Sequence, residues 1–226
     1  MNDLAANPGD GVVLLHGILL NRWFMIRLEH RFKDLGYRTL NPSYPSSRYR
    51  IEELAERLHP RIDRFAQRLK GRLHFVTHSM GGLITRVLLK TRRPPNLGRV
   101  CMLGPPNHGS EVADWWKHRW LYRVLFGPAG QQLGTDQQGL AEFPGPVDYE
   151  LGVIAADRTW DVFNARFLPR PHDGKVSVAS TRLEGMQDHI TLHATHTFMV
   201  FNPEVIRQAA YFLKHGRFDA AGRPAD

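Results

Sequence analysis

The chain has 226 residues, of which 42% are hydrophobic and 23% charged. This length and balance are typical of one globular domain with a sizeable core and exclude a disordered chain. The single cysteine, Cys101, excludes an intrachain disulfide, and no apolar stretch is long enough to span a bilayer.

The formal net charge is +8, which favours anionic partners. Basic residues are spread along the chain, and the densest run comprises Arg57, Arg61, Arg64, Arg68, Lys70 and Arg72. No nucleic-acid motif accompanies them, so we expect weak attraction to an anionic membrane surface and no nucleic-acid partner. The first eleven residues lack the basic and apolar regions of a signal peptide, which favours a cytoplasmic location.

Apolar runs and amphipathic segments alternate along the first half of the chain. The pattern predicts strands at 11–17, 37–40, 73–77 and 99–103, and helices at 22–35, 50–70 and 80–90. Gly36 lies where a helix C-cap is expected, and Pro60 is expected to kink or split the second helix. Strands that alternate with helices at these spacings predict a mostly parallel sheet with helices on both faces.

In the second half a strand is expected at 150–155 and a last helix at 203–214, with Asn202 as N-cap and Gly216 after its end. Between about 110 and 146 the pattern breaks down, which predicts an insertion above the sheet. The tryptophans of this segment, Trp115, Trp116 and Trp120, are candidates for a lid or acyl-binding wall. We expect a single domain over 1–216 and a flexible tail at 217–226.

One segment combines a strand, a tight turn and a helix around a serine. It reads Leu73-His-Phe-Val-Thr-His-Ser79-Met-Gly81-Gly82. Small residues are needed around such a serine because the turn is strained and neighbouring backbones come close. The segment matches the G-x-S-x-G nucleophile elbow except that Thr77 replaces the first glycine, and it makes Ser79 the candidate nucleophile.

These motifs occur in the order found in a known superfamily. They are the His16-Gly17 loop, the elbow at 77–81, the turn at 104–110, and the later Asp-Gly and His segments. Over roughly residues 11–215 the chain resembles compact bacterial lipases and esterases of the α/β-hydrolase superfamily, of the PGAP1-like lipase type. The resemblance implies a minimal α/β-hydrolase fold, because the chain starts directly at the strand before His16.

The resemblance also implies an oxyanion hole built from two backbone N–H groups. One belongs to Met80, the residue after the nucleophile. The other belongs to Ile18, or to Leu19, in the loop after the first strand. Backbone donors suit this role because they are fixed before charge develops.

The family order places an acid after the serine and before the histidine. Asp173 stands in an Asp-Gly turn before an apolar segment, resembles the acid loop of the family and is the preferred candidate. Asp157, at the end of the 150–155 strand, is the rival. A structural role for Asp173 as a simple turn residue is the alternative.

Three histidines, His189, His193 and His196, lie close together in sequence. His196 precedes the final helix, where the family places its catalytic histidine, and His193 is the second choice. The same three could be read as a metal site, but neither helix nor strand periodicity puts them on one face, and no His-Glu-x-x-His signature is present. No metal or other cofactor is expected.

The sequence therefore predicts a serine esterase or lipase with Ser79 as nucleophile, His196 as base and Asp173 as acid, acting on a small-molecule or lipid ester through an acyl-enzyme. An acyltransferase or thioesterase would use the same residues, because the fold does not decide among acyl acceptors. A hydrolase-fold protein that binds lipid or a partner without catalysis is the remaining alternative.

Overall fold

A computed structural model describes residues 2–136, 145–161 and 163–222 of the chain. Within them six parallel strands form one sheet in the order β2-β1-β3-β4-β5-β6. The strands are β1 (Gly11–Leu15), β2 (Arg38–Leu40), β3 (Leu73–His78), β4 (Leu97–Leu103), β5 (Leu151–Arg158) and β6 (Asp188–Thr195). The mostly parallel α/β class expected from the sequence is confirmed.

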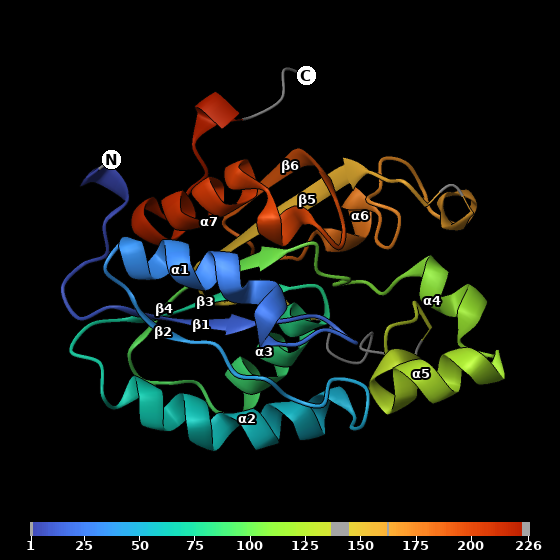
Figure 1. The fold of residues 1–226 in the computed structure, drawn as a ribbon, viewed down its shortest axis with the longest axis horizontal. Helices are drawn as coiled ribbons and strands as arrows, with labels where there is room; N and C mark the ends of the chain where they lie inside the picture. The colour runs from blue at the N-terminus through green and yellow to red at the C-terminus, as the bar shows by residue number, and fades with distance from the viewer. Residues whose placement is uncertain (1, 137–144, 162, 223–226) are drawn as a thin grey trace.

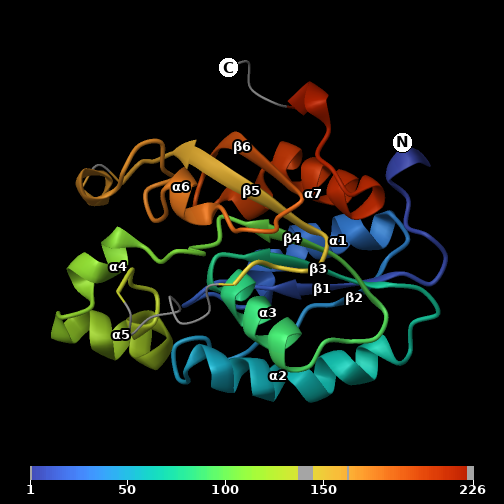
Figure 2. The ribbon, with the colours of Figure 1, turned by 180° about the vertical axis from the view of Figure 1, so that it is seen from behind.

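Helices cover both faces of this sheet (Figures 1 and 2). They are α1 (Ile26–Asp34), α2 (Ile51–Ala66), α3 (Met80–Thr91), α4 (Glu111–Trp116), α5 (Trp120–Gln131), α6 (Val178–Thr181) and α7 (Pro203–His215). Short 3₁₀ turns are η1 (Asn2–Leu4), η2 (Arg22–Met25), η4 (Asn164–Phe167), η5 (Met199–Phe201) and η6 (Ala220–Gly222). Helices α1 and α7 cover one face, and α2 and α3 cover the other.

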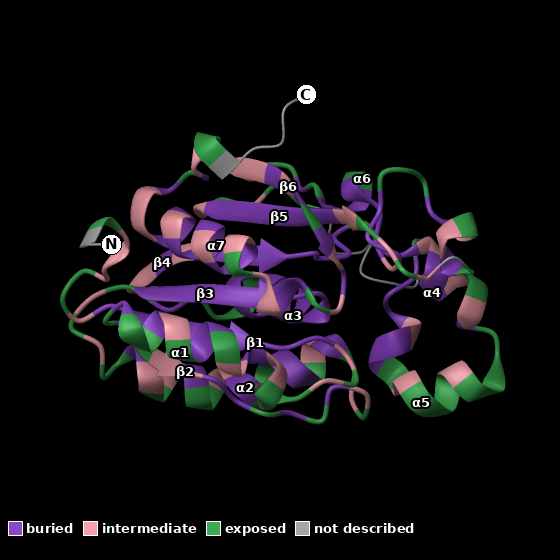
Figure 3. Ribbon diagram, turned by 45° about the horizontal axis from the view of Figure 1, so that its top comes forward, coloured by how far each residue is buried: buried purple, intermediate pink, exposed green. Residues whose placement is uncertain are grey.

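Each face of the sheet has its own hydrophobic core. Alternate strand residues contribute to the two cores, as Val13 and Leu15 do on the α2–α3 face and Val12 and Leu14 on the α1–α7 face. All four side chains are fully buried. Strands β1 and β3 are buried along their whole length, whereas the helices alternate buried and exposed residues, which Figure 3 shows as purple and green bands. Near-continuous apolar strands are what a parallel sheet covered on both faces requires.

Helices α4 and α5 lie beyond the carboxyl ends of the strands, at the right of Figure 1. The end of α5 is tied to the domain because Gln132 accepts a hydrogen bond from Ile51 N (2.7 Å) and donates two to Glu52 (both 2.9 Å) at the start of α2. The sequence led us to expect an insertion here but not two helices. Its remaining part, 137–144, lies outside the described residues.

Other elements also differ from the sequence-based expectations. Strand β6 was not expected, and Pro60 lies inside α2, which runs through it as one helix. The caps of α7 are confirmed, since Asn202 Oδ1 accepts from Glu204 N (2.9 Å) and Gly216 has φ +74°.

Part of the segment from residue 217, expected as a flexible tail, packs on the domain through Phe218 and Asp219. Phe218 is buried, its ring centroid lies 5.1 Å from that of Phe212, and its N–H donates to Asp188 Oδ2 at 2.8 Å. This apolar contact anchors the segment after α7. Residues 223–226 lie outside the described residues.

None of the helices in the described ranges is both long and apolar enough to cross a bilayer. The expected cytoplasmic location stays a prediction.

Candidate active site

Ser79 lies at the apex of a strained turn between β3 and α3. Its backbone has φ 52° and ψ −124°, outside the regions that a side-chain-bearing residue ordinarily adopts. The turn needs small neighbours: a Cβ at Gly81 would lie 2.5 Å from Leu15 O, and a Cβ at Gly17 would lie 3.3 Å from Ser79 Cβ. The buried Thr77 replaces a glycine of the elbow motif within β3 without disturbing this geometry.

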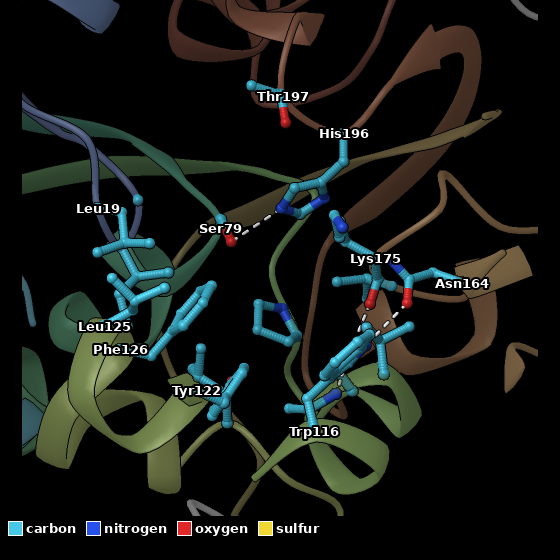
Figure 4. A pocket seen from close by; sticks show the side chains of 18 of the residues that line it. Leu19, Ser79, Trp116, Tyr122, Leu125, Phe126, Asn164, Lys175, His196 and Thr197 are labelled. Atoms are coloured by element: carbon cyan, nitrogen blue, oxygen red, sulfur yellow. Dashed lines mark hydrogen bonds between the residues drawn. The ribbon is translucent and has the colours of Figure 1, made fainter. Parts of the chain in front are cut away.

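The structure brings Ser79, His196 and Asp173 into one chain of hydrogen bonds. His196 Nε2 lies 3.0 Å from Ser79 Oγ (Figure 4), and His196 Nδ1 lies 2.7 Å from Asp173 Oδ2. Because a carboxylate accepts, Nδ1 carries the proton, and Nε2 is left to accept the serine proton. All three residues are buried. The arrangement can raise the nucleophilicity of Ser79 and stabilise a positive charge on His196.

Asp173 is held by its own turn. Its Oδ1 accepts from Lys175 N (2.9 Å) and Val176 N (2.8 Å), which leaves Oδ2 for His196. Gly104, after β4, lies against this pair: a Cβ there would be 3.3 Å from His196 Nδ1 and 3.4 Å from Asp173 Oδ2. The local hydrogen bonds therefore fix the carboxylate before any substrate binds.

The rival candidates lie elsewhere. Asp157 bonds to the exposed His193, with Nδ1–Oδ2 at 2.8 Å, and His189 Nε2 lies 3.0 Å from Thr181 Oγ1. The three histidines thus have three separate partners. Over the ranges that the structure describes, no group of three His, Cys, Asp or Glu residues could hold a metal ion.

A second histidine, His78, contacts the backbone of His196. Its Nε2–H donates to the His196 carbonyl oxygen at 2.8 Å, and the two ring centroids are 5.1 Å apart. Burial, with a smaller contribution from the charge of His196, lowers the pKa of His78 to about 3, so its ring is neutral. Sequence reasoning passed over His78 because a histidine inside the elbow has no local signal of its own.

The loop after β1 lies beside Ser79. His16 Nδ1–H donates to Gly17 O at 2.8 Å, its ring stacks on Tyr44, and burial lowers its pKa to about 4. Tyr44 in turn donates a short hydrogen bond to the His16 carbonyl. Leu19 has φ +59°, so the chain turns sharply after Ile18, which lines the cavity described next. Met80 begins α3, where an N–H has no acceptor in its own helix.

A cavity of about 970 Å³ opens over Ser79 and His196. This volume is at the upper end of the range for small-molecule sites, about 300–1,000 Å³. Its walls are mainly apolar and come from the β1 loop, α4 and α5; they include Leu19, Leu20, Val112, Leu121, Tyr122, Leu125, Phe126 and Leu133. In Figure 4 the rings of Tyr122 and Phe126 lie below Ser79.

The three predicted tryptophans do not behave alike. Trp116 and Trp120 line the cavity, whereas Trp115 does not and stacks on Phe167, with centroids 4.4 Å apart. The expectation for Trp115 is therefore corrected: its ring packs α4 onto η4. Tyr122, Leu125 and Phe126, which belong to the same apolar segment as the tryptophans, also line the cavity.

A family model described as the alpha/beta hydrolase family matches residues 12–214. No curated protein matches the sequence significantly.

Several solved structures share the fold. The mature form of the lipase BlEst2 from Bacillus licheniformis has a TM-score of 0.68 at 21% identity, over 87% of this chain and 89% of that one. A metagenomic carboxyl esterase gives 0.68 at 18% identity, over 85% and 66%. Phospholipase PlaB from Legionella pneumophila gives 0.61 at 17% identity, over 84% and 53%, so this chain spans about half its length. At these identities the likeness is one of fold; the PGAP1-like subtype stays a prediction.

Proposed function

The chain belongs to the alpha/beta hydrolase family, and from this premise we propose that it is a serine carboxylic-ester hydrolase. The observation that carries the proposal is the hydrogen-bonded chain from Ser79 through His196 to Asp173, at the base of a large apolar cavity. Structural neighbours whose names say lipase, esterase and phospholipase support a small-molecule or lipid ester as substrate.

The proposed reaction has two steps. His196 Nε2 takes the proton of Ser79 as Oγ attacks the ester carbonyl carbon, and Asp173 stabilises the resulting imidazolium. The backbone N–H groups of Ile18 and Met80 are proposed to bind the oxyanion. Protonated His196 then gives its proton to the departing alcohol. In the second step His196 deprotonates a water that attacks the acyl-enzyme. The bond between the acyl carbon and Ser79 Oγ then breaks, and protonated His196 returns the proton to Oγ.

Hydrolysis of p-nitrophenyl esters of increasing chain length tests the proposal. We expect Ser79→Ala and His196→Ala to lower kcat by orders of magnitude, and Asp173→Asn by about 10³–10⁴-fold, because the imidazole would lose its correct tautomer. Asp157→Asn is the matched control, since this carboxylate also bonds a histidine but not His196. Full activity in Ser79→Ala would contradict the proposal, and an inert wild type would direct attention to acyl transfer.

We further propose that the protein associates peripherally with anionic lipid. Helix α5 exposes Trp120 (74%), Val124 (68%), Leu121 (53%) and Leu125 (50%), beside the exposed Arg119 and Arg123. Trp120, Leu121 and Leu125 also line the cavity, so this apolar stripe lies along its edge. An apolar helix face flanked by arginines is suited to a lipid–water interface, and the net charge of +8 adds attraction to anionic headgroups.

Vesicle sedimentation tests this association. The wild type is expected to bind phosphatidylglycerol vesicles more than phosphatidylcholine vesicles, and the double variant Trp120→Ser/Val124→Ser is expected to lose most of that binding. Equal binding by the double variant would show that α5 is not the contact.

A further inference from the structure

The cavity has two unlike walls (Figure 4). Leu19, Leu125 and Phe126 form an apolar side, while Trp116, Asn164 and Lys175 lie on the opposite side. Ser79 and His196 lie at the top, between the two. An ester held at Ser79 would therefore place its acyl chain and its alcohol against surfaces of different chemistry.

The polar wall is cationic. Among the described lining residues, Arg119 and Lys175 carry positive charge and no Asp or Glu is present. Lys175 Nζ is already paired with Asp161 Oδ2 at 3.0 Å, and Asp161 does not line the cavity. Arg119 has no carboxylate within ion-pair distance among the described residues, so its charge is left for a ligand.

The Arg119 guanidinium is oriented by stacking. It lies over the ring of Trp116, 5.1 Å from the centroid, and 5.6 Å from that of Trp115. Trp116 is itself fixed, because its Nε1–H donates to Asn164 Oδ1 at 2.9 Å. A guanidinium held in this way keeps its N–H donors free for the paired oxygens of a phosphate or carboxylate.

We propose that Arg119, with Lys175, forms an anion subsite, and that the substrate is an acyl ester whose alcohol carries a phosphate or carboxylate group. The acyl chain lies along Leu19, Leu125 and Phe126, and the anionic alcohol lies toward Trp116 and Arg119. The hydrolytic part of this inference rests on the proposed function; the anion subsite rests on the charge and geometry of the wall.

Kinetics with octanoyl esters, short enough to stay monomeric, test the inference. The substrates are 1-octanoylglycerol 3-phosphate, O-octanoyl glycolate, 1-octanoylglycerol and octanoylcholine. We expect kcat/KM for at least one anionic ester to exceed that for 1-octanoylglycerol, with octanoylcholine the poorest. The anionic ester that is preferred identifies the group recognised. Raising the ionic strength to about 0.5 M should reduce the preference.

Arg119→Gln is expected to lower the ratio of anionic to neutral kcat/KM about threefold to tenfold, mainly through KM, because an exposed ion pair is modest in strength. Arg119→Lys should restore part of it. The matched control is Arg57→Gln, which removes an arginine stacked on Tyr49 (3.8 Å) outside the cavity and should leave the ratio unchanged. The proposal would be contradicted if the wild type showed a ratio of anionic to neutral kcat/KM near one. It would also be contradicted if Arg119→Gln showed the same ratio as the wild type.

A binding measurement separates this failure from failure of the proposed function. Calorimetry on Ser79→Ala compares octyl phosphate with 1-O-octylglycerol, neither of which is an ester of a carboxylic acid. Tighter binding of octyl phosphate that is lost in Ser79→Ala/Arg119→Gln supports the subsite even if no ester is cleaved. Equal affinity of the two ligands overturns it, whatever the hydrolysis assays show.

Discussion

His78 contacts His196 through a hydrogen bond to the backbone of His196 rather than to its ring. Its Nε2–H donates to the carbonyl oxygen of His196, while Ser79 and Asp173 hold the two ring nitrogens. Full burial keeps the His78 ring neutral, so it adds no charge next to the imidazolium that the proposed reaction forms. His78 is therefore a candidate positioning residue for His196.

His78→Phe tests this role, because the ring remains but the donor is lost. We expect kcat to fall about tenfold with little change in KM, since the loss of one hydrogen bond to a buried carbonyl costs about 1–2 kcal/mol. Ester hydrolysis under saturating and dilute substrate separates the two constants.

His74→Phe is the matched control for that variant. His74 is buried in the same strand, but it accepts from Arg99 N (2.9 Å) and approaches Asp10 (3.4 Å), away from the cavity. The His74→Phe substitution should lower the free energy of unfolding and leave kcat per folded molecule unchanged. If both variants lowered kcat equally, His78 would have only a structural role.

Turn motifs predicted Ser79 and Asp173, and the resemblance to the family predicted His196 from its place before the final helix; the structure brings the three side chains into hydrogen-bonding contact. His78 had no local signal, and the turn at 104–110 did not show that Gly104 would lie against His196, because these contacts join residues far apart in the sequence. Sequence patterns find what a turn needs, whereas these contacts depend on tertiary packing.

At the scale of elements, β1 and α3 approach each other at Gly81. A Cβ there would lie 2.5 Å from the carbonyl oxygen of Leu15, which is backbone and cannot move aside cheaply. Gly81→Ala should lower the free energy of unfolding by about 1–3 kcal/mol, as overpacking does, although alanine favours helix elsewhere. Urea denaturation measures the change.

The glycine that serves as control is Gly145, where a Cβ would meet nothing within 4 Å. Gly145→Ala should change the free energy of unfolding by no more than about 0.5 kcal/mol. If Gly81→Ala had the same free energy of unfolding as the wild type, β1 and α3 would be able to move apart without loss of stability.

The elements that sequence patterns missed are those with weak periodicity. β6 buries Ile190, Leu192 and Ala194, with the polar Thr191 and His193 between them, so it has no continuous apolar run. α5 contains Gly127 with φ 56° followed by Pro128, residues typical of turns, so its helical pattern is obscured. β1, which is buried along its whole length, was recognisable because its apolar run is continuous.

At the scale of the whole molecule, several buried histidines make stability depend on pH. Burial lowers the pKa of His16 to about 4, of His78 to about 3 and of His189 to about 4. In the unfolded chain these histidines bind protons below about pH 6.5, whereas in the folded chain they bind protons only when the pH approaches their lowered pKa values. The stabilisation is thus complete above pH 6.5 and is lost as the pH falls toward 4.

Thermal unfolding between pH 8 and pH 5 measures this effect. We expect the midpoint to be flat above pH 7 and to fall below 6.5, with each histidine contributing at most about 1.4 kcal/mol per pH unit. His189→Gln should reduce the slope without affecting the hydrogen bonds of Ser79. A midpoint that does not change from pH 7 to pH 5 would contradict the assignment of neutral, buried histidines.

The strand order has a consequence for how the protein is made. After β1, the strands β3, β4, β5 and β6 add to the same side of the sheet in the order in which the ribosome releases them. Each emerging strand therefore finds its partner already synthesised, and the chain can assemble as it is translated. Ser79 is in place early, but His196 follows β6, so a nascent chain carries the serine without its base until all six strands have been made.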